Sequence, residues 1–341
     1  MLQHGGRLND AVKRWGIPRE QWLDLSTGIN PLGWPVPELP ADVWQRLPED
    51  DDGLEQIIRH WSGAPLAAGC VSVAGSQAAI MALPSLRKPC CVGIPVPGYR
   101  EHGLHWHSAG HKVVPIGPRQ AQGGASGCDD RWLDQLDVLV WINPNNPTGE
   151  IIPPSTLLRW HKRLQKRGGW LVVDEAFMDA TPAFSLACQS GRPGLIVLRS
   201  LGKFFGLAGI RAGFVLADKN LADRLTEKLG SWAVNGPARY VMAKALLDLN
   251  WQQNTCGRLQ SSAQRLREIV HSAGLNPMGG SALFHTVRTD APTALADCLA
   301  AQGVLVRIFE QPGMVRFGLA SGESQWRRLE KALARAPVIN H

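Results

Sequence analysis

The chain has 341 residues, of which 44% are hydrophobic and 19% charged, so extensive disorder is excluded and an ordinary globular protein is expected. This length favours one large domain together with a smaller one. The net charge of +7 is compatible with binding either nucleic acid or phosphorylated metabolites.

Cysteine usage and the N-terminus indicate a cytoplasmic protein. The seven cysteines are scattered along the chain without a C-x-x-C pair, which predicts reduced thiols and neither a disulfide framework nor a zinc site. The first ten residues lack the basic and apolar regions of a secretory signal. No apolar run reaches the length that a membrane-spanning helix needs.

In chain order, the first forty residues are rich in glycine and proline and are expected to form an arm that contributes to the active site. Continuous apolar runs then predict buried strands at 137–142, 170–173, 195–198 and 213–216. A helix is expected at 155–167, and its dense basic run, 161–167, is interpreted as a solvated helix face rather than a nucleic-acid patch. Parallel strands between helices predict an α/β fold that binds ligands at the carboxyl ends of the strands.

The C-terminal third has a different pattern. One long helix, possibly broken, is expected at 238–273, and shorter elements follow. They are strands at 283–287, 304–308 and 314–319 and a helix at 293–302. This α+β pattern predicts a smaller domain. The expected organisation is an arm, a large domain and a small domain, at 1–40, 41–235 and 236–341.

The strongest chemical signal surrounds Lys203. The lysine follows a predicted strand in a glycine-rich turn, with Ser200 before it and Arg211 after it. A lysine forms an imine with an aldehyde cofactor when its amine is partly unprotonated, and a nearby cation such as Arg211 favours that state. Ser200 and Arg211 are also suited to hold a phosphate. Alone, this pattern also fits an ordinary surface lysine.

Three further sequence elements favour a cofactor-binding lysine over an ordinary surface lysine. Asp174 ends a predicted strand and could pair with a protonated pyridine nitrogen, although it could also cap the next segment. Asn146 lies in a proline-framed turn and could donate to a ring oxygen. Ser76 and Gln77 begin an apolar helix after Gly75 and offer backbone N–H groups to a phosphate.

Together these elements resemble the class I/II aminotransferase family of pyridoxal phosphate enzymes, which have fold type I, over nearly the whole chain. The resemblance implies a mostly parallel large domain, a smaller α+β C-terminal domain and pyridoxal 5'-phosphate as cofactor. It assigns the catalytic roles to Lys203, Asp174 and Tyr99, where Tyr99 stacks on the ring. It also implies cofactor contacts from Ser76, Gln77, Tyr99, Asn146, Asp174, Ser200, Lys203 and Arg211.

A narrower resemblance begins at His4, Gly5 and Gly6 and continues through the segment 24–33. These motifs are similar to those of the threonine-phosphate decarboxylases of cobalamin biosynthesis. The resemblance implies a phosphorylated amino-acid substrate, loss of carbon dioxide and a homodimer. It also implies a set of substrate-binding residues, namely His4, Gly5, Gly6, Asn30, Arg307 and Arg316. Which arginine binds carboxylate and which binds phosphate stays open.

Two positions depart from the family pattern. Leu47 replaces a tyrosine that reaches the cofactor phosphate of the partner subunit, and Phe177 replaces a tyrosine near the ring oxygen. A histidine cluster is expected on a surface helix without a metal, because it lacks cysteine or acidic partners beyond Glu101. Its members are His102, His105, His107 and His111.

Two other functions remain open at this stage. An aminotransferase, for instance one that acts on histidinol phosphate, needs the same cofactor residues, so only the N-terminal motif favours decarboxylation. A non-catalytic basic binding protein would explain the charge without the chemistry. Neither a nucleic-acid partner nor a membrane is expected.

Overall fold

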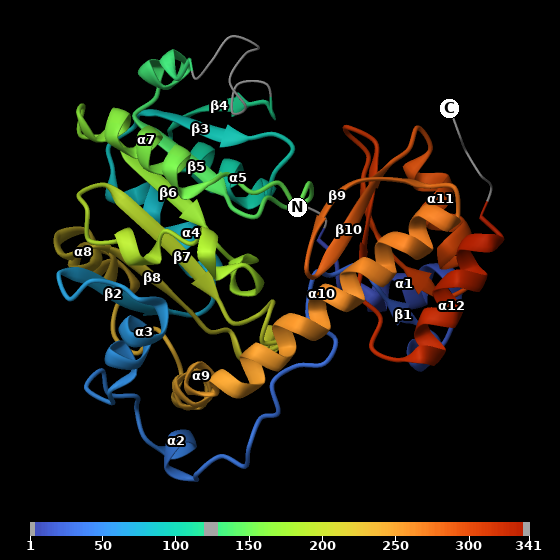
Figure 1. Ribbon diagram of the computed structural model, residues 1–341. Coiled ribbons are helices and arrows are strands. Elements are labelled where there is room, and N and C mark those ends of the chain that lie inside the picture. Colours follow the sequence, from blue (N-terminus) through green and yellow to red (C-terminus); the bar gives the residue numbers. More distant parts are fainter. Residues whose placement is uncertain (1–3, 119–128, 337–341) are drawn as a thin grey trace. The chain divides into compact units, whose positions relative to one another are not determined.

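In the computed structural model, which describes residues 4–118 and 129–336, the chain passes between two units. Unit 1 comprises the described parts of Met1–Gly33, Pro147–Glu150 and Trp251–His341. Unit 2 comprises the described parts of Trp34–Asn146 and Ile151–Asn250 (Figure 1). The helices and strands of each unit follow from its own pattern of apolar residues.

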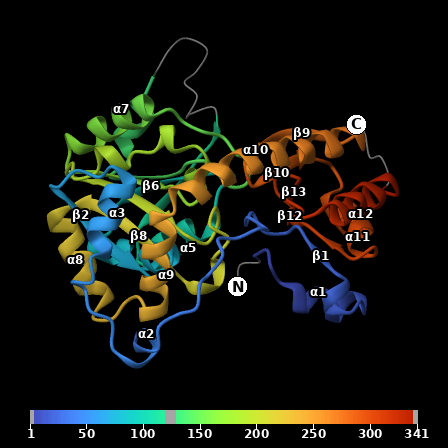
Figure 2. The same cartoon turned by 60° about the horizontal axis from the view of Figure 1, so that its bottom comes forward.

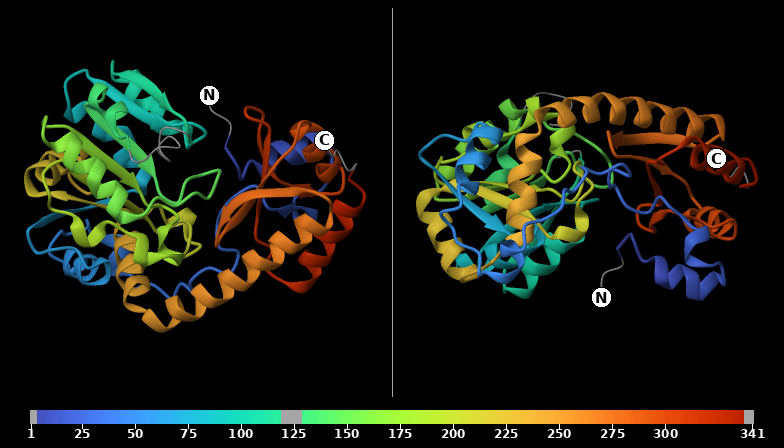
Figure 3. Two further views of the ribbon diagram at one scale, coloured as in Figure 1. Left: turned by 45° about the horizontal axis from the view of Figure 1, so that its top comes forward. Right: turned by 90° about the horizontal axis from the view of Figure 1, so that it is seen from below.

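Unit 2 is built on a seven-stranded sheet in the order β2-β8-β7-β6-β5-β3-β4. Figures 1 and 3 show β2 and β4 at its opposite edges. The strands are β2 (Ala68–Val73), β3 (Cys91–Pro95), β4 (Lys112–Ile116), β5 (Val138–Ile142), β6 (Trp170–Asp174), β7 (Leu195–Ser200) and β8 (Gly213–Asp218). The four strands expected between residues 137 and 216 are confirmed, and β5 and β6 are buried throughout because helices cover both faces of the sheet.

One of those strands runs in the opposite direction from the expectation. Strands β3 to β7 pair in parallel, but β8 pairs antiparallel with β7 and with β2. The connection between β7 and β8 contains a 3-10 turn, Ala208–Ile210, in place of a crossover helix. A parallel return needs such a crossover, so this short connection brings the chain back antiparallel.

Helices cover both faces of the unit 2 sheet. Side chains from α4 (Ser76–Ala82), α5 (Arg100–Ser108) and α8 (Lys219–Leu229) share one core with strand residues such as Val140. The next residue, Trp141, points to the other face, where its ring lies 5.2 Å from that of Trp160 in α7 (Pro154–Gln165). The described part of this unit also contains α2 (Asp42–Gln45), α3 (Leu54–Ser62) and α9 (Gly236–Leu247).

Unit 1 contains an antiparallel sheet in the order β12-β13-β10-β9, and β1 pairs in parallel with β11. Its strands are β1 (Leu23–Asp24), β9 (Asn276–Ser281), β10 (Phe284–Arg288), β11 (Val304–Leu305), β12 (Arg307–Phe309) and β13 (Met314–Gly318). The single strand expected at 304–308 is therefore wrong. It divides at buried Val306 because its two halves pair with different sheets.

The helices of unit 1 are α1 (Leu8–Trp15), α10 (Leu249–Ser272), α11 (Pro292–Ala300) and α12 (Glu323–Ala334). The long helix expected at 238–273 is broken at Asp248, whose backbone leaves the helical region. Helices α11 and α12 lie side by side (Figure 2), joined by Gln302 Nε2, which donates to the Ala332 carbonyl at 3.1 Å. Helix α12 and strand β9 were not predicted from the sequence.

The sequence predicts reduced thiols and no membrane-spanning helix. The six cysteines in the described part of the chain are free thiols, and Cys128 lies outside that part. Among the helices in the described ranges, none combines the length and apolar character that crossing a bilayer requires.

Candidate active site

Polar groups of unit 2 gather at the carboxyl ends of the parallel strands. Strand β3 lies between β4 and β5, so the chain changes direction across the sheet at β3 and β5. Such a switch point is where open α/β sheets bind ligands. The segments that follow these strands are joined directly, because Asn145 Nδ2 donates to the Pro97 carbonyl at 3.0 Å. Tyr99 and Asn146 belong to these two segments.

Asp174 ends strand β6 and is buried. Its Oδ1 accepts from the Ala176 backbone N–H at 3.1 Å, and its Oδ2 lies 2.9 Å from Nε2 of His102. His102 in α5 is only 1% exposed. A buried carboxylate with two donors is held rigidly, which suits an acid that faces a cationic ring nitrogen.

The expected surface cluster of histidines is therefore wrong for His102, which sequence reasoning missed as a site residue. Its ring also lies edge-to-face with that of Tyr99, 6.2 Å away. The sequence feature that could have indicated His102 is its three-residue spacing from Tyr99. This spacing brings two side chains together at the start of a helix.

The other histidines of the cluster have separate partners. His105 Nε2 lies 3.1 Å from Oε2 of Glu101. His111 is also buried, with Nε2 at 2.9 Å from the Pro84 carbonyl and Nδ1 accepting from the Cys90 N–H at 3.2 Å. Across residues 4–118 and 129–336, no group of three or more histidine, cysteine or acidic residues could hold a metal ion.

Lys203 follows strand β7, and its Nζ lies 5.4 Å from the centre of the Phe177 ring. Phe177 is buried at the end of the segment that follows Asp174. An aromatic face attracts an ammonium group and has no hydroxyl to donate. The replacement of tyrosine by Phe177 therefore leaves an apolar, π-rich wall beside the amine.

Close backbone approach creates an anion cradle near the start of α4. Gly75 has φ +74°, and a Cβ there would lie 2.9 Å from Nη2 of Arg211. A Cβ on Gly213 would lie 3.2 Å from the backbone N of Ser76. The two glycines thus let a guanidinium and a backbone N–H lie near each other, which is the donor set of a phosphate. These residues fit the phosphate of pyridoxal phosphate.

Ser200 and Gln77 make contacts of their own around this cradle. The Ser200 hydroxyl accepts from the Gly202 N–H at 3.2 Å. The Gln77 side chain is turned toward Tyr99, whose hydroxyl donates to Gln77 Oε1 at 3.2 Å. The backbone of Gln77, rather than its amide, is therefore the part suited to a phosphate.

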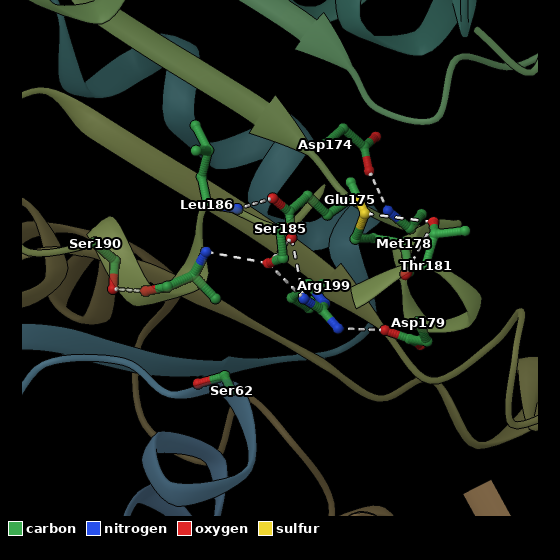
Figure 4. Close-up of polar contacts among 12 residues, drawn as sticks. Ser62, Asp174, Glu175, Met178, Asp179, Thr181, Ser185, Leu186, Ser190 and Arg199 are labelled. Atoms are coloured by element: carbon green, nitrogen blue, oxygen red, sulfur yellow. Dashed lines mark hydrogen bonds and ion pairs between the residues drawn. The ribbon is translucent and has the colours of Figure 1, made fainter. Parts of the chain in front are cut away.

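A buried ionic network around Glu175 and Arg199 lies beside Asp174 (Figure 4). Arg199 donates to Glu175 Oε2 at 3.0 Å and also pairs with Asp179. Ser185 Oγ donates to the same Glu175 oxygen at 2.6 Å. Burial raises the pKa of Glu175 and of Asp179, while Arg199 opposes that rise. The network connects the ends of β6 and β7, which carry two of the predicted cofactor contacts.

A second polar cluster lies wholly within unit 1, around Ser26. Arg316 in β13 is 5% exposed and donates from Nη2 to the Ser26 carbonyl at 3.0 Å. The Gly6 N–H donates to Ser26 Oγ at 2.7 Å. A Cβ on Gly5 would lie 2.2 Å from the Ser26 carbonyl oxygen, so only glycine fits there. This contact explains the paired glycines of the N-terminal motif, and Ser26, which was not singled out from the sequence, joins them to Arg316.

Two arginines adjoin in the same cluster. Arg307 and Arg316 are opposite one another in the β12–β13 pair. Burial, and then repulsion from Arg307, lower the pKa of Arg316 to about 9. Two neighbouring cations, one of them buried, are stabilised by an anion. Asn30 is buried and its Oδ1 accepts from the Leu32 N–H at 3.0 Å, whereas His4 is exposed.

The predicted residues thus fall into two groups. Unit 2 contains all the predicted cofactor contacts and unit 1 contains all the predicted substrate contacts. Within unit 2, direct contacts join Tyr99 to Gln77 and bring Arg211 against Gly75. Within unit 1, Ser26 joins the N-terminal glycines to Arg316.

A sheet with its switch point at β3 and β5, a lysine after β7 and a buried acid at the end of β6 define a fold type I transferase. The chain belongs to the class I and II aminotransferase family, whose model matches residues 55–333. This confirms the fold class and the family expected from the sequence.

The chain is also similar to individual members of this family, in sequence and in fold. The chain is 51% identical to the threonine-phosphate decarboxylase of Pseudomonas aeruginosa, across 98% of this chain and 97% of the relative. The solved histidinol-phosphate aminotransferase of Clostridium acetobutylicum is similar in fold, with a TM-score of 0.79 and 22% identity over 91% of this chain and 98% of that one. The histidinol-phosphate aminotransferase of Sinorhizobium meliloti, solved with pyridoxal-5'-phosphate, has a TM-score of 0.77. It is 21% identical over 86% of this chain and 83% of that one.

Proposed function

We propose that the protein is a pyridoxal-phosphate-dependent threonine-phosphate decarboxylase, a carbon–carbon lyase. It removes carbon dioxide from L-threonine O-3-phosphate and forms (R)-1-amino-2-propanol O-2-phosphate for cobalamin biosynthesis. The observation that carries this proposal is the 51% identity to a relative of that name over 98% of the chain. The free thiols of the described residues are compatible with a cytoplasmic enzyme.

The residues of unit 2 would hold the cofactor. Lys203 would supply the amine for its aldehyde, and Asp174 and Asn146 would pair with its ring nitrogen and ring oxygen. Arg211 and the Ser76 N–H would hold its phosphate. When bound, pyridoxal phosphate supplies a sink for the electrons released at the substrate Cα. The Asp174 carboxylate, which His102 contacts at 2.9 Å, would keep the ring nitrogen protonated.

The residues of unit 1 would orient the substrate. Arg316 and Arg307 offer two cationic groups to its carboxylate and phosphate, and a planar guanidinium binds either anion with two parallel hydrogen bonds. The orientation in which these groups hold the substrate would decide which bond at its Cα is broken. The N-terminal glycines hold Ser26, and Ser26 holds Arg316, so the N-terminal motif contributes to that orientation.

The second candidate is an aminotransferase that acts on a substrate such as histidinol phosphate. The likeness in fold to two solved enzymes of that name favours it, but identities of 22% and 21% support the fold alone. The same cofactor residues serve both reactions, so the two candidate functions are distinguished by the products that form.

The test uses the purified chain with pyridoxal phosphate and L-threonine O-3-phosphate, without any 2-oxo acid. We expect stoichiometric carbon dioxide and aminopropanol phosphate, and no release from Lys203→Ala. A strict need for a 2-oxo acid, with amino transfer to it, would establish the aminotransferase instead. A colourless protein whose Lys203→Ala variant behaves like the wild type would indicate a non-catalytic binding protein.

We further infer a homodimer, as the family resemblance implies. Trp44 and Leu47 are 66% and 63% exposed and lie on or next to α2. Large apolar side chains exposed this close together are typical of an interaction surface. Light scattering coupled to size-exclusion chromatography is expected to give about twice the chain mass of 37.1 kDa, and a monomer at micromolar concentration would contradict this.

A further inference from the structure

The histidine cluster that the proposed function leaves unused contains a second polar arrangement, on the side of α5 that faces Gln77. Glu101 and His105 lie one turn apart on this helix. The His105 Nε2 lies 3.1 Å from Glu101 Oε2. Gln77 Nε2 donates to the same oxygen at 3.1 Å. Two nitrogens therefore converge on one carboxylate oxygen.

This carboxylate determines which way the Gln77 amide points. An ionised carboxylate only accepts hydrogen bonds, so Gln77 must turn its NH₂ group toward Glu101. Its Oε1 is then directed at Tyr99, whose hydroxyl donates to it at 3.2 Å. The chain of contacts from Glu101 through Gln77 to Tyr99 has a single consistent direction, set by the acid.

The arrangement is sheltered from water. The Glu101 side chain is 11% exposed and the His105 side chain 22%. Hydrogen bonds in such a setting are stronger than on an open surface, and an orphaned partner is costly. The ring of Tyr99 also contacts His102 edge-to-face, so the phenol is restrained at its hydroxyl end and at its ring.

We propose that Glu101 is a positioning residue, which acts through Gln77 to hold the phenol of Tyr99 in place at the carboxyl end of β3. His105 supports Glu101 through the 3.1 Å contact between its Nε2 and Glu101 Oε2. The proposal rests on the proposed function to the extent that Tyr99 faces the cofactor ring. No atom of Glu101 or His105 is required to touch cofactor or substrate.

The first measurement needs no cofactor. The chain contains only two tyrosines, Tyr99 and Tyr240, so tyrosine labelled with ¹³C in the ring gives a simple spectrum with an internal reference. Glu101→Gln and Glu101→Ala are expected to shift or broaden the Tyr99 ring signal while Tyr240 is unchanged. His107→Gln, an exposed residue of the same helix, is the matched control and should move neither signal. An unchanged Tyr99 signal in Glu101→Ala would overturn the proposal.

The second measurement is the dissociation constant for pyridoxal phosphate, obtained by titrating the apo protein and following tryptophan fluorescence. We expect Glu101→Ala to weaken binding about three- to tenfold, the effect of losing one restraining hydrogen bond. In a Tyr99→Phe background the same change should have almost no effect, because the hydroxyl through which Glu101 acts is gone. An equal loss in both backgrounds would mean that Glu101 is merely structural, and the proposal would be wrong.

The two measurements separate this inference from the function on which it rests. If the wild type binds no pyridoxal phosphate, the proposed function fails. The Tyr99 signal still decides whether Glu101 positions the phenol.

Discussion

At the scale of single residues, the candidate site depends on pairs that the fold brings together. Asp174 is held by the Ala176 N–H and by His102, and Lys203 lies over the Phe177 ring. His102 contacts the Asp174 carboxylate at 2.9 Å, and the Phe177 ring lies 5.4 Å from the Lys203 amine. Changes at a supporting residue should therefore reduce the rate less than changes at the residue it supports.

The first prediction concerns Asp174 and His102. Asp174→Asn keeps the shape but removes the negative charge, so we expect the rate of carbon dioxide release to fall by more than about a hundredfold at saturating cofactor. His102→Gln leaves the charge and loosens its geometry, with an expected loss of about ten- to a hundredfold. His107→Gln serves as the control and should match the wild type. If Asp174→Asn kept half of the activity, the role assigned to Asp174 would be incorrect.

At the scale of elements, an ionic clamp holds the segment between α2 and α3 against α9. Arg239 in α9 donates to both oxygens of Asp52, at 2.7 and 2.8 Å, and to Asp50 at 3.0 Å. Asp52 Oδ1 also accepts from the Leu54 N–H at 3.0 Å, at the start of α3. One carboxylate thus caps one helix and pairs with another.

The second prediction is a pH-dependent loss of stability in Asp52→Asn. Partial burial alone would raise the pKa of Asp52, but the bonds from Arg239 and from the Leu54 N–H lower it below its ordinary value of 3.8. A carboxyl group with a lowered pKa stabilises the fold above its ordinary value, and this contribution is lost as the pH falls through the lowered pKa. At pH 7 we expect a loss of about 1 kcal/mol in the free energy of unfolding, since Asp52 is partly exposed.

Urea denaturation at several pH values checks this prediction. The difference between wild type and Asp52→Asn should shrink below about pH 4. Asp50→Asn is the matched control, because the Asp50 side chain is 92% exposed and its removal should change stability by less than about 0.5 kcal/mol. A difference that stayed constant down to pH 2 would contradict the assignment.

At the scale of the whole molecule, the chain enters unit 1 for only a short stretch in the middle of unit 2. This crossing loop is Pro147–Glu150, and it begins directly after Asn146. In unit 1, the buried Thr286 hydroxyl donates to the Pro147 carbonyl at 2.6 Å. In unit 2, Asn143 closes the base of the loop with two hydrogen bonds to the Ile152 backbone, at 2.8 and 3.1 Å. Asn146 is therefore the last residue of unit 2 before the segment that Thr286 holds within unit 1.

The third prediction tests this anchoring with Gly149→Ala. Gly149 has φ +73°, and a Cβ there would lie 2.0 Å from the Gly280 carbonyl oxygen, so alanine is excluded by both conformation and space. We expect hydrogen exchange of the amides in 143–152 to accelerate by about tenfold or more, the equivalent of roughly 1–3 kcal/mol.

The control for this variant is Gly257→Ala in α10, where a Cβ would meet nothing within 4 Å. Alanine favours a helix over glycine, so this change should leave exchange in the loop unaltered and stability slightly higher. Wild-type exchange across 143–152 in Gly149→Ala would show that the loop is not held as described.

Local pattern was sufficient for much of this protein. The apolar runs that became β5, β6 and β7 are continuous, and the polar residues after them fall at one edge because parallel strands end together. For that reason Lys203, Asp174 and Asn146 could be proposed as one site without coordinates. The N-terminal motif likewise pointed to the decarboxylase relatives before any contact of Gly5 or Gly6 was visible.

The tertiary structure alone decided the features that depend on residues far apart in the chain. The direction of β8 depends on its connection and its two neighbours, and the division of 304–308 depends on two different sheets. His102 became the partner of Asp174, 72 residues away, and Ser26 the partner of Arg316. Side-chain periodicity records which face of an element is buried, but it holds no information about which distant group meets that face. Only the packing of the folded chain determines which distant residues contact one another.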